Sequence, residues 1–103
     1  MGLKIVQSRR ADNEVYTILE YLLEKWNSKI ANDFLDDLEK ARSLIAMAPF
    51  SFPIVEQSSQ VRKFLLKPYY RVFYIVREDE IFIISIFDMR QYPNKLKSIL
   101  EQW

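Results

Sequence analysis

The spacing of apolar residues predicts that the first part of the chain is helical. Between residues 11 and 26 apolar side chains recur at intervals of three and four, with acidic residues between them. They are Ala11, Val15, Ile18, Leu19, Leu22, Leu23 and Trp26. Ser8 precedes them and is of a type that caps helices. We predict an amphipathic helix and interpret Glu14, Glu20 and Glu24 as part of its solvated face.

A second amphipathic helix is predicted to follow within a few residues. Asn27-Ser28 interrupts the first pattern and offers a new cap, and Pro49 ends the helix that follows. Its apolar positions step by three and four and are Ile30, Phe34, Leu38, Ala41, Ile45 and Ala48. Because the connection is so short, the two helices should form an antiparallel hairpin with facing apolar stripes.

The remaining segments are rich in β-branched and aromatic residues, which favours strands. A short strand is expected at the start of the chain and three more after a proline-punctuated loop at residues 50–60. The predicted strands are Leu3–Gln7, Val61–Leu66, Tyr69–Arg77 and Ile81–Asp88. The polar run Glu78-Asp79-Glu80 is expected to form a hairpin turn between the last two, which makes three antiparallel strands in succession.

A short helix over Asn94–Gln102, with Pro93 in its first turn, is predicted to close the chain. The fold class is therefore α+β, in the order β-α-α-β-β-β-α, with the helical hairpin packed on a small antiparallel-rich sheet. A chain of 103 residues has room for one compact core, so we expect residues 1–103 to form a single domain.

Alternation along the strands suggests where basic side chains gather. Arg71 shares a strand face with apolar residues, and Ile84, Ile86, Asp88 and Arg90 have one parity along the last strand. An Arg62, Arg71 and Arg90 cluster at one end of the sheet could grip phosphates or carboxylates, because guanidinium groups are planar donors that keep their charge. The alternative is that each arginine packs its stem and points its head to solvent.

Composition excludes several kinds of chemistry. The chain contains no cysteine and no histidine, which removes disulfides, thiol nucleophiles, the usual zinc sites and histidine general bases. We therefore expect no metal and no cofactor. The net charge of +1 is unevenly spread, since residues 1–59 carry −2 and residues 60–103 carry +3. An anion-binding surface is accordingly expected in the second part of the chain.

The start of the chain and its apolar runs bear on location. The first residues contain too short an apolar run for a signal peptide, and no stretch approaches the roughly 18 apolar residues of a membrane span. We expect a cytoplasmic protein without membrane contact.

Four segments, taken in order, resemble the RelE/ParE toxin superfamily. They are the opening strand with Ser8 and Ala11, the hairpin end Leu44–Pro49, the strand Pro68–Tyr74 and the closing Ile83–Gln91. The resemblance covers essentially the whole chain. It implies the toxin of a type II toxin–antitoxin pair, of the plasmid-stabilisation type, which arrests growth and is neutralised by a cognate antitoxin.

The RelE-like branch of this superfamily resembles ribosome-dependent mRNA endoribonucleases. Arg71 and Arg90 match its phosphate-binding arginines, and Arg62 falls where it has one of two lysines. The other lysine position holds Phe64, and the site of its C-terminal tyrosine aligns with Leu96. On this alternative Arg62, Arg71 and Arg90 would be catalytic. The residues expected to bind substrate would be Lys63, Lys67 and Tyr92.

The ParE-like branch resembles inhibitors of DNA gyrase, and the long helical hairpin suits it well. We favour this reading over mRNA cleavage, because a catalytic set without its proton-transfer residue supports an enzyme less well than an intact binding surface supports an inhibitor. A member that binds its antitoxin and has lost its toxicity stays open as a third reading, and so does a homodimer.

Overall fold

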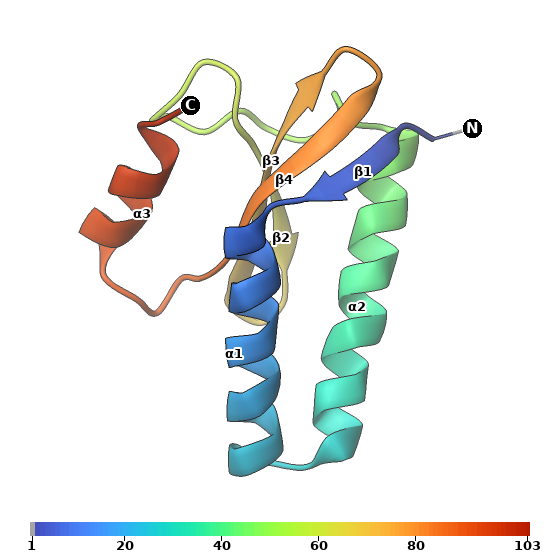
Figure 1. The fold of residues 1–103 in the computed structure, drawn as a ribbon, viewed down its shortest axis with the longest axis vertical. Coiled ribbons are helices and arrows are strands. Elements are labelled where there is room, and N and C mark those ends of the chain that lie inside the picture. The colour runs from blue at the N-terminus through green and yellow to red at the C-terminus, as the bar shows by residue number, and fades with distance from the viewer. Residues whose placement is uncertain (1) are drawn as a thin grey trace.

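The computed structural model describes residues 2–103 and has the predicted order of elements (Figure 1). The strands are β1 (Lys4–Gln7), β2 (Arg62–Leu66), β3 (Tyr70–Arg77) and β4 (Glu80–Asp88). The helices are α1 (Arg9–Lys25), α2 (Ser28–Met47) and α3 (Pro93–Leu100). The α+β fold with the order β-α-α-β-β-β-α is thereby confirmed.

Both long helices begin where the sequence supplies a capping side chain. The Ser8 hydroxyl oxygen accepts a hydrogen bond from the backbone N–H of Ala11 at 3.0 Å, and Asn27 Oδ1 accepts one from Ile30 at the same distance. Each cap satisfies a backbone N–H that has no partner inside its helix. The helices α1 and α2 then run side by side as the predicted hairpin (Figure 1).

The sheet has the strand order β1-β4-β3-β2 and is mostly antiparallel. The strands β2, β3 and β4 form successive antiparallel pairs, whereas β1 lies parallel to β4 at the opposite edge. The turn between β3 and β4 is one residue shorter than predicted, because Glu80 already pairs with Arg77. Glu78 takes a φ of 47° there, a left-handed conformation that closes a tight hairpin.

The helical hairpin packs on one face of this sheet. Phe34 is buried at the centre of the interface, and its ring meets that of Tyr70 edge to face with centroids 5.2 Å apart. The predicted stripe of α2 is wrong at Ile30, which is 37% exposed, because the neighbouring Ala31 faces the core instead. Leu23 of α1 and Trp26, which follows directly after that helix, are also exposed.

The other face of the sheet is covered by α3. Leu96, Ile99 and Leu100 of this helix are buried against strand residues that include Phe73 and Phe87. The sheet is thus covered on both faces, which explains why β3 and β4 are apolar at nearly every position rather than at alternate ones.

An irregularity in β4 overturns the predicted alternation of that strand. Phe73 pairs with Ser85 and Tyr74 pairs with Ile83, so Ile84 has no partner of its own in β3. One extra residue inverts the order of faces beyond it. Ile86 therefore packs on the hairpin side, whereas Ile84 packs under α3, and the two do not share a face.

Candidate functional site

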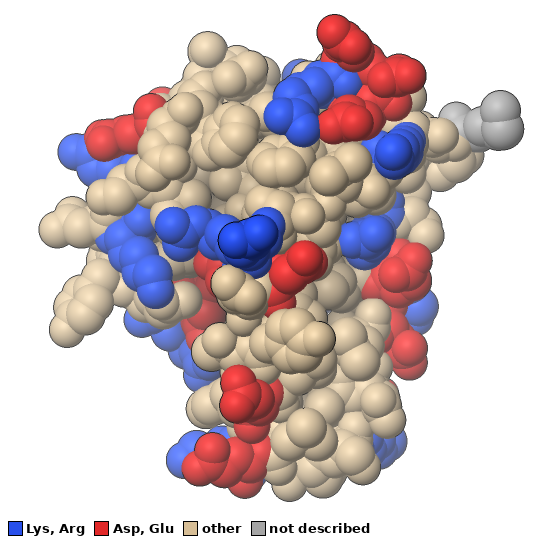
Figure 2. Space-filling model, in the orientation of Figure 1, with Lys and Arg blue, Asp and Glu red and all other residues tan. Residues whose placement is uncertain are grey.

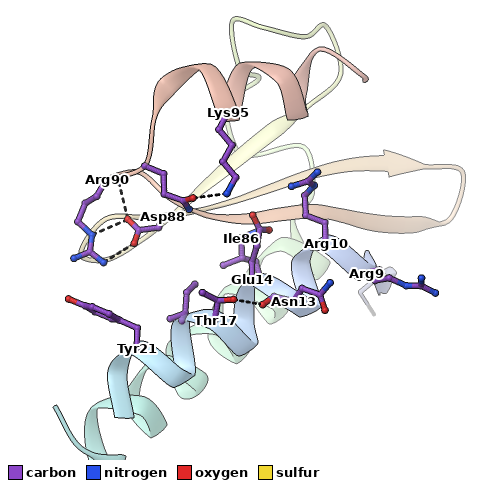
Figure 3. Close-up of a pocket in the computed structure, with 12 residues that line it drawn as sticks. Arg9, Arg10, Asn13, Glu14, Thr17, Tyr21, Ile86, Asp88, Arg90 and Lys95 are labelled. Atoms are coloured by element: carbon purple, nitrogen blue, oxygen red, sulfur yellow. Dashed lines mark hydrogen bonds and ion pairs between the residues drawn. The ribbon is translucent and has the colours of Figure 1, made fainter. Parts of the chain in front are cut away.

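A cleft opens beside the far end of β4, along the edge of that strand that β1 leaves unpaired. Within residues 2–103, β1 pairs with β4 only along Glu80–Ile83, and the first turns of α1 lie beside the remainder (Figure 3). The cleft has a volume of about 790 Å³. Its lining residues are Arg9, Arg10, Asn13, Glu14, Thr17, Ile18, Tyr21, Ile86, Asp88, Arg90, Gln91 and Lys95.

Glu14 occupies the bottom of the cleft and takes the place of a strand neighbour. Its carboxylate accepts hydrogen bonds from the Ser85 hydroxyl at 2.8 Å and from the backbone N–H of Ile86 at 2.9 Å. Burial raises the pKa of the Glu14 carboxyl, although both hydrogen bonds and the charges of Arg10 and Lys95 act to lower it. The interpretation of Glu14 as a solvated helix residue is wrong.

Sequence reasoning missed Glu14, but one signal could have found it. Ser85 interrupts the run Ile83-Ile84-Ser85-Ile86-Phe87 and is fully buried. A buried hydroxyl requires a hydrogen-bond partner, and the partner here comes from the opposite end of the chain.

Cationic side chains stand around this carboxylate. Arg10 projects from α1 and Lys95 from α3, on the two sides of the cleft, and Lys95 Nζ donates to Gln91 Oε1 at 2.9 Å (Figure 3). Within residues 2–103, no ion pair within 4.0 Å involves Arg9, Arg10 or Lys95. Figure 2 shows Lys and Arg side chains gathered from the start of α1 towards α3. The surface around the cleft therefore favours an anionic group.

Arg90 closes one end of the cleft and is held rigidly. Its guanidinium donates to both carboxylate oxygens of Asp88, at 3.0 and 2.7 Å. It also lies over the ring of Tyr69, with 3.7 Å between its Cζ and the ring centroid, and 5.3 Å from that of Tyr21. Burial raises the pKa of the Asp88 carboxyl, but the hydrogen bonds and charge of Arg90 outweigh it and hold that pKa below its ordinary value.

The predicted cluster of three arginines does not form. Arg62 lies opposite Tyr74, on the hairpin face, whereas Arg71 lies opposite Leu65 and Phe87, on the face covered by α3. Directly opposed residues share a face, so the alternation of two paired strands separates Arg62 from Arg71.

The Arg62 side chain is moreover hydrogen-bonded to the loop that follows α2. Its Nη1 donates to the carbonyl oxygens of Phe50 at 3.2 Å and Phe52 at 2.7 Å, which ties the loop after α2 to the sheet. The Arg71 side chain donates to the carbonyl oxygen of Tyr70. Of the three arginines, Arg90 alone lines the cleft.

The other residues singled out in the sequence lie outside the cleft. Lys63 lies opposite Phe73 on the α3 face, Lys67 is exposed in the turn after β2, and Tyr92 is 84% exposed just before α3. Leu96, at the position of the nuclease tyrosine, is a residue of α3 that is buried against the sheet, and Phe64 packs against the ring of Phe52. The roles predicted for Lys63, Lys67 and Tyr92 in substrate binding stay predictions.

A comparison with known protein families shows to which family this chain belongs. The family model described as the ParE toxin of the type II toxin–antitoxin system, parDE, matches residues 5–93. The chain belongs to the ParE toxin family. The matched residues of this ParE-family chain include every residue that lines the cleft except Lys95. The predicted membership of the RelE/ParE superfamily is confirmed.

A solved structure shares the fold of this chain. The structure described as the chromosomal ParDE TA system from P. aeruginosa matches with a TM-score of 0.72 and 18% sequence identity. The alignment covers 84% of this chain and 95% of that one, so the likeness extends to nearly the whole fold. No curated protein matches. Among residues 2–103, no helix is long and apolar enough to span a membrane.

Proposed function

We propose that this chain acts as a type II toxin by binding and inhibiting DNA gyrase, in the cytoplasm where that target lies. The observation that carries the proposal is the ParE family match over residues 5–93. The geometry does not favour the nuclease alternative, because Arg62 is bound to loop carbonyls and lies on a different sheet face from Arg71. A nuclease would need these guanidinium groups together on one phosphate.

The test places the purified chain in two assays side by side. We expect it to inhibit supercoiling of relaxed plasmid by gyrase and to leave ribosome-bound mRNA intact in a translating system. Cleavage of the mRNA with unimpaired supercoiling would replace the proposal by the nuclease alternative. In that case the folded Arg71→Ala/Arg90→Ala double variant should lose cleavage, because both arginines would stabilise the charge of the transition state.

A cognate antitoxin is the second proposed partner. The chain exposes large apolar side chains along its hairpin and the loop that follows, among them Tyr16, Leu23, Trp26, Leu44, Met47 and Phe50. Exposed apolar surface of this kind is typical of a protein that is covered by a partner. Co-expression with the product of an adjacent short reading frame should yield a stable complex that no longer inhibits gyrase. A chain that co-purifies with no partner and is harmless to its host would contradict this.

A further inference from the structure

The cleft between α1, the end of β4 and α3 combines positive charge with apolar side chains, and these two features together indicate the chemistry of its ligand. Arg10 and Lys95 carry positive charge on its two sides, and Arg90 stands at one end (Figure 3). Beneath them lie the apolar side chains of Ile18 and Ile86. A ligand that satisfies both features has an apolar side chain flanked by negative groups.

We propose that this cleft binds an acidic segment of a partner protein, with an apolar side chain of the segment over Ile18 and its carboxylates on Arg10 and Lys95. This proposal rests on the proposed function in one respect, because both assume that the partner is a protein.

Charge complementarity identifies the occupant as acidic. The lining carries four cationic side chains, Arg9, Arg10, Arg90 and Lys95, against the two carboxylates of Glu14 and Asp88. Asp88 is bound to Arg90, and Glu14 is bound to Ser85 and Ile86 at the bottom of the cleft. Arg10 and Lys95 lie close enough to Glu14 for their charges to lower its pKa, but neither forms an ion pair within 4.0 Å in residues 2–103. The lining therefore has two more positive than negative charges, and this excess favours an anionic ligand.

The same lining favours a peptide over a nucleic acid. Phosphates follow one another at fixed short intervals along a nucleic-acid strand, so some would lie against Glu14 and Asp88. A peptide can place its carboxylates at the two sides of the cleft and an apolar side chain between them. The lining holds one aromatic side chain, Tyr21, whose ring faces the Arg90 guanidinium at 5.3 Å, as in Figure 3, so it offers no series of aromatic rings for base stacking.

The experiment maps binding on the isotope-labelled full chain by NMR. The probes are a short synthetic peptide of Glu, Leu and Ser, the same peptide with every Glu replaced by Gln, and a thymidine oligonucleotide of similar length. We expect saturable shifts at residues 9–21 and 86–95 with the acidic peptide, weakened by added salt. The Gln peptide should bind much more weakly, because it lacks the carboxylates.

Two charge-reversal variants locate the site. Arg10→Glu/Lys95→Glu should weaken binding of the acidic peptide by about tenfold or more, since two attractive contacts become repulsive. The matched control, Lys29→Glu/Lys40→Glu, changes the net charge equally on α2, outside the cleft, and should leave the affinity unchanged. If the reversed variant does not fold, Arg10→Gln/Lys95→Gln should weaken binding in the same direction.

Four outcomes overturn the proposal: no saturable binding, shifts centred away from the cleft, equal loss in the control variant, and tighter binding of the oligonucleotide than of the peptide. The gyrase assay on the same preparation separates the two proposals. If the chain inhibits gyrase but does not bind the peptide, only the cleft proposal is wrong. If it binds the peptide but does not affect gyrase, only the proposed target is wrong.

Discussion

The carboxylate of Glu14 on α1 accepts a hydrogen bond of 2.9 Å from the backbone N–H of Ile86 in β4, beyond the point where β1 stops pairing with that strand. The backbone at an unpaired strand edge requires partners, and here a side chain supplies one. The start of α1 is thereby fixed against the end of β4. This contact also sets the floor of the cleft.

Replacing Glu14 with Gln should change how stability depends on pH. Burial raises the pKa of Glu14 in the folded state, so its ionisation costs more there than in the unfolded chain. The wild type should therefore lose stability relative to Glu14→Gln as the pH rises from about 4 towards neutrality, since an unperturbed glutamate has a pKa of about 4.3. Denaturant titrations of both proteins at several pH values measure the difference. If the free energy of unfolding of the wild type instead rose relative to that of Glu14→Gln over this range, the folded state would favour the ionised form of Glu14 and the prediction would be wrong.

Replacing Phe34 with Ala should destabilise the fold strongly. Phe34 is 6% exposed and its ring meets that of Tyr70 edge to face, so the variant leaves a cavity in the core between the hairpin and the sheet, at a cost of about 3 kcal/mol or more. Ile30→Ala on the same helix is the matched control and should cost less than about 1 kcal/mol, because Ile30 is 37% exposed. Thermal melts report both. Equal shifts in melting temperature would contradict the packing of α2.

Arg62 and Arg71 should respond differently to the same substitution. Arg62→Ala removes two hydrogen bonds to the loop after α2 and should cost about 1 kcal/mol or more of unfolding free energy. Arg71→Ala removes a contact with its neighbour Tyr70 and should stay within about 0.5 kcal/mol. Urea titrations measure the free energy of unfolding of each variant. A larger loss for Arg71→Ala than for Arg62→Ala would contradict the structural roles assigned to the two arginines.

Ser8→Ala should cost more than removal of the other helix cap. The Ser8 hydroxyl caps α1 and also donates to the carbonyl oxygen of Ile84 at 2.7 Å, so we expect a loss of about 2 kcal/mol. Asn27→Ala removes a cap at the exposed end of the hairpin and should cost about 1 kcal/mol. The two unfolding free energies, measured under one set of conditions, should differ in this order. Identical losses would mean that the bond to Ile84 contributes nothing.

The sequence alone determined the elements, their order and the family resemblance. These features depend on interactions between residues that are close together in the chain, and such interactions can be inferred from the sequence itself. They include the helix periodicity, the caps at Ser8 and Asn27 and the apolar strands. The arginines could be named in the same way, but the spacing of Arg62 and Arg71 did not reveal which sheet face each would occupy.

Tertiary structure decided the rest because it depends on pairing between distant residues. One unmatched residue at Ile84 inverts the faces of β4 and carries Ile86 to the hairpin side. The parallel pairing of β1 stops at Ile83, which opens the edge that Glu14 closes from a position more than 70 residues away in the chain. Register and edge pairing are set by the packing of both sheet faces at once, so no local pattern could place the cleft or the carboxylate at its floor.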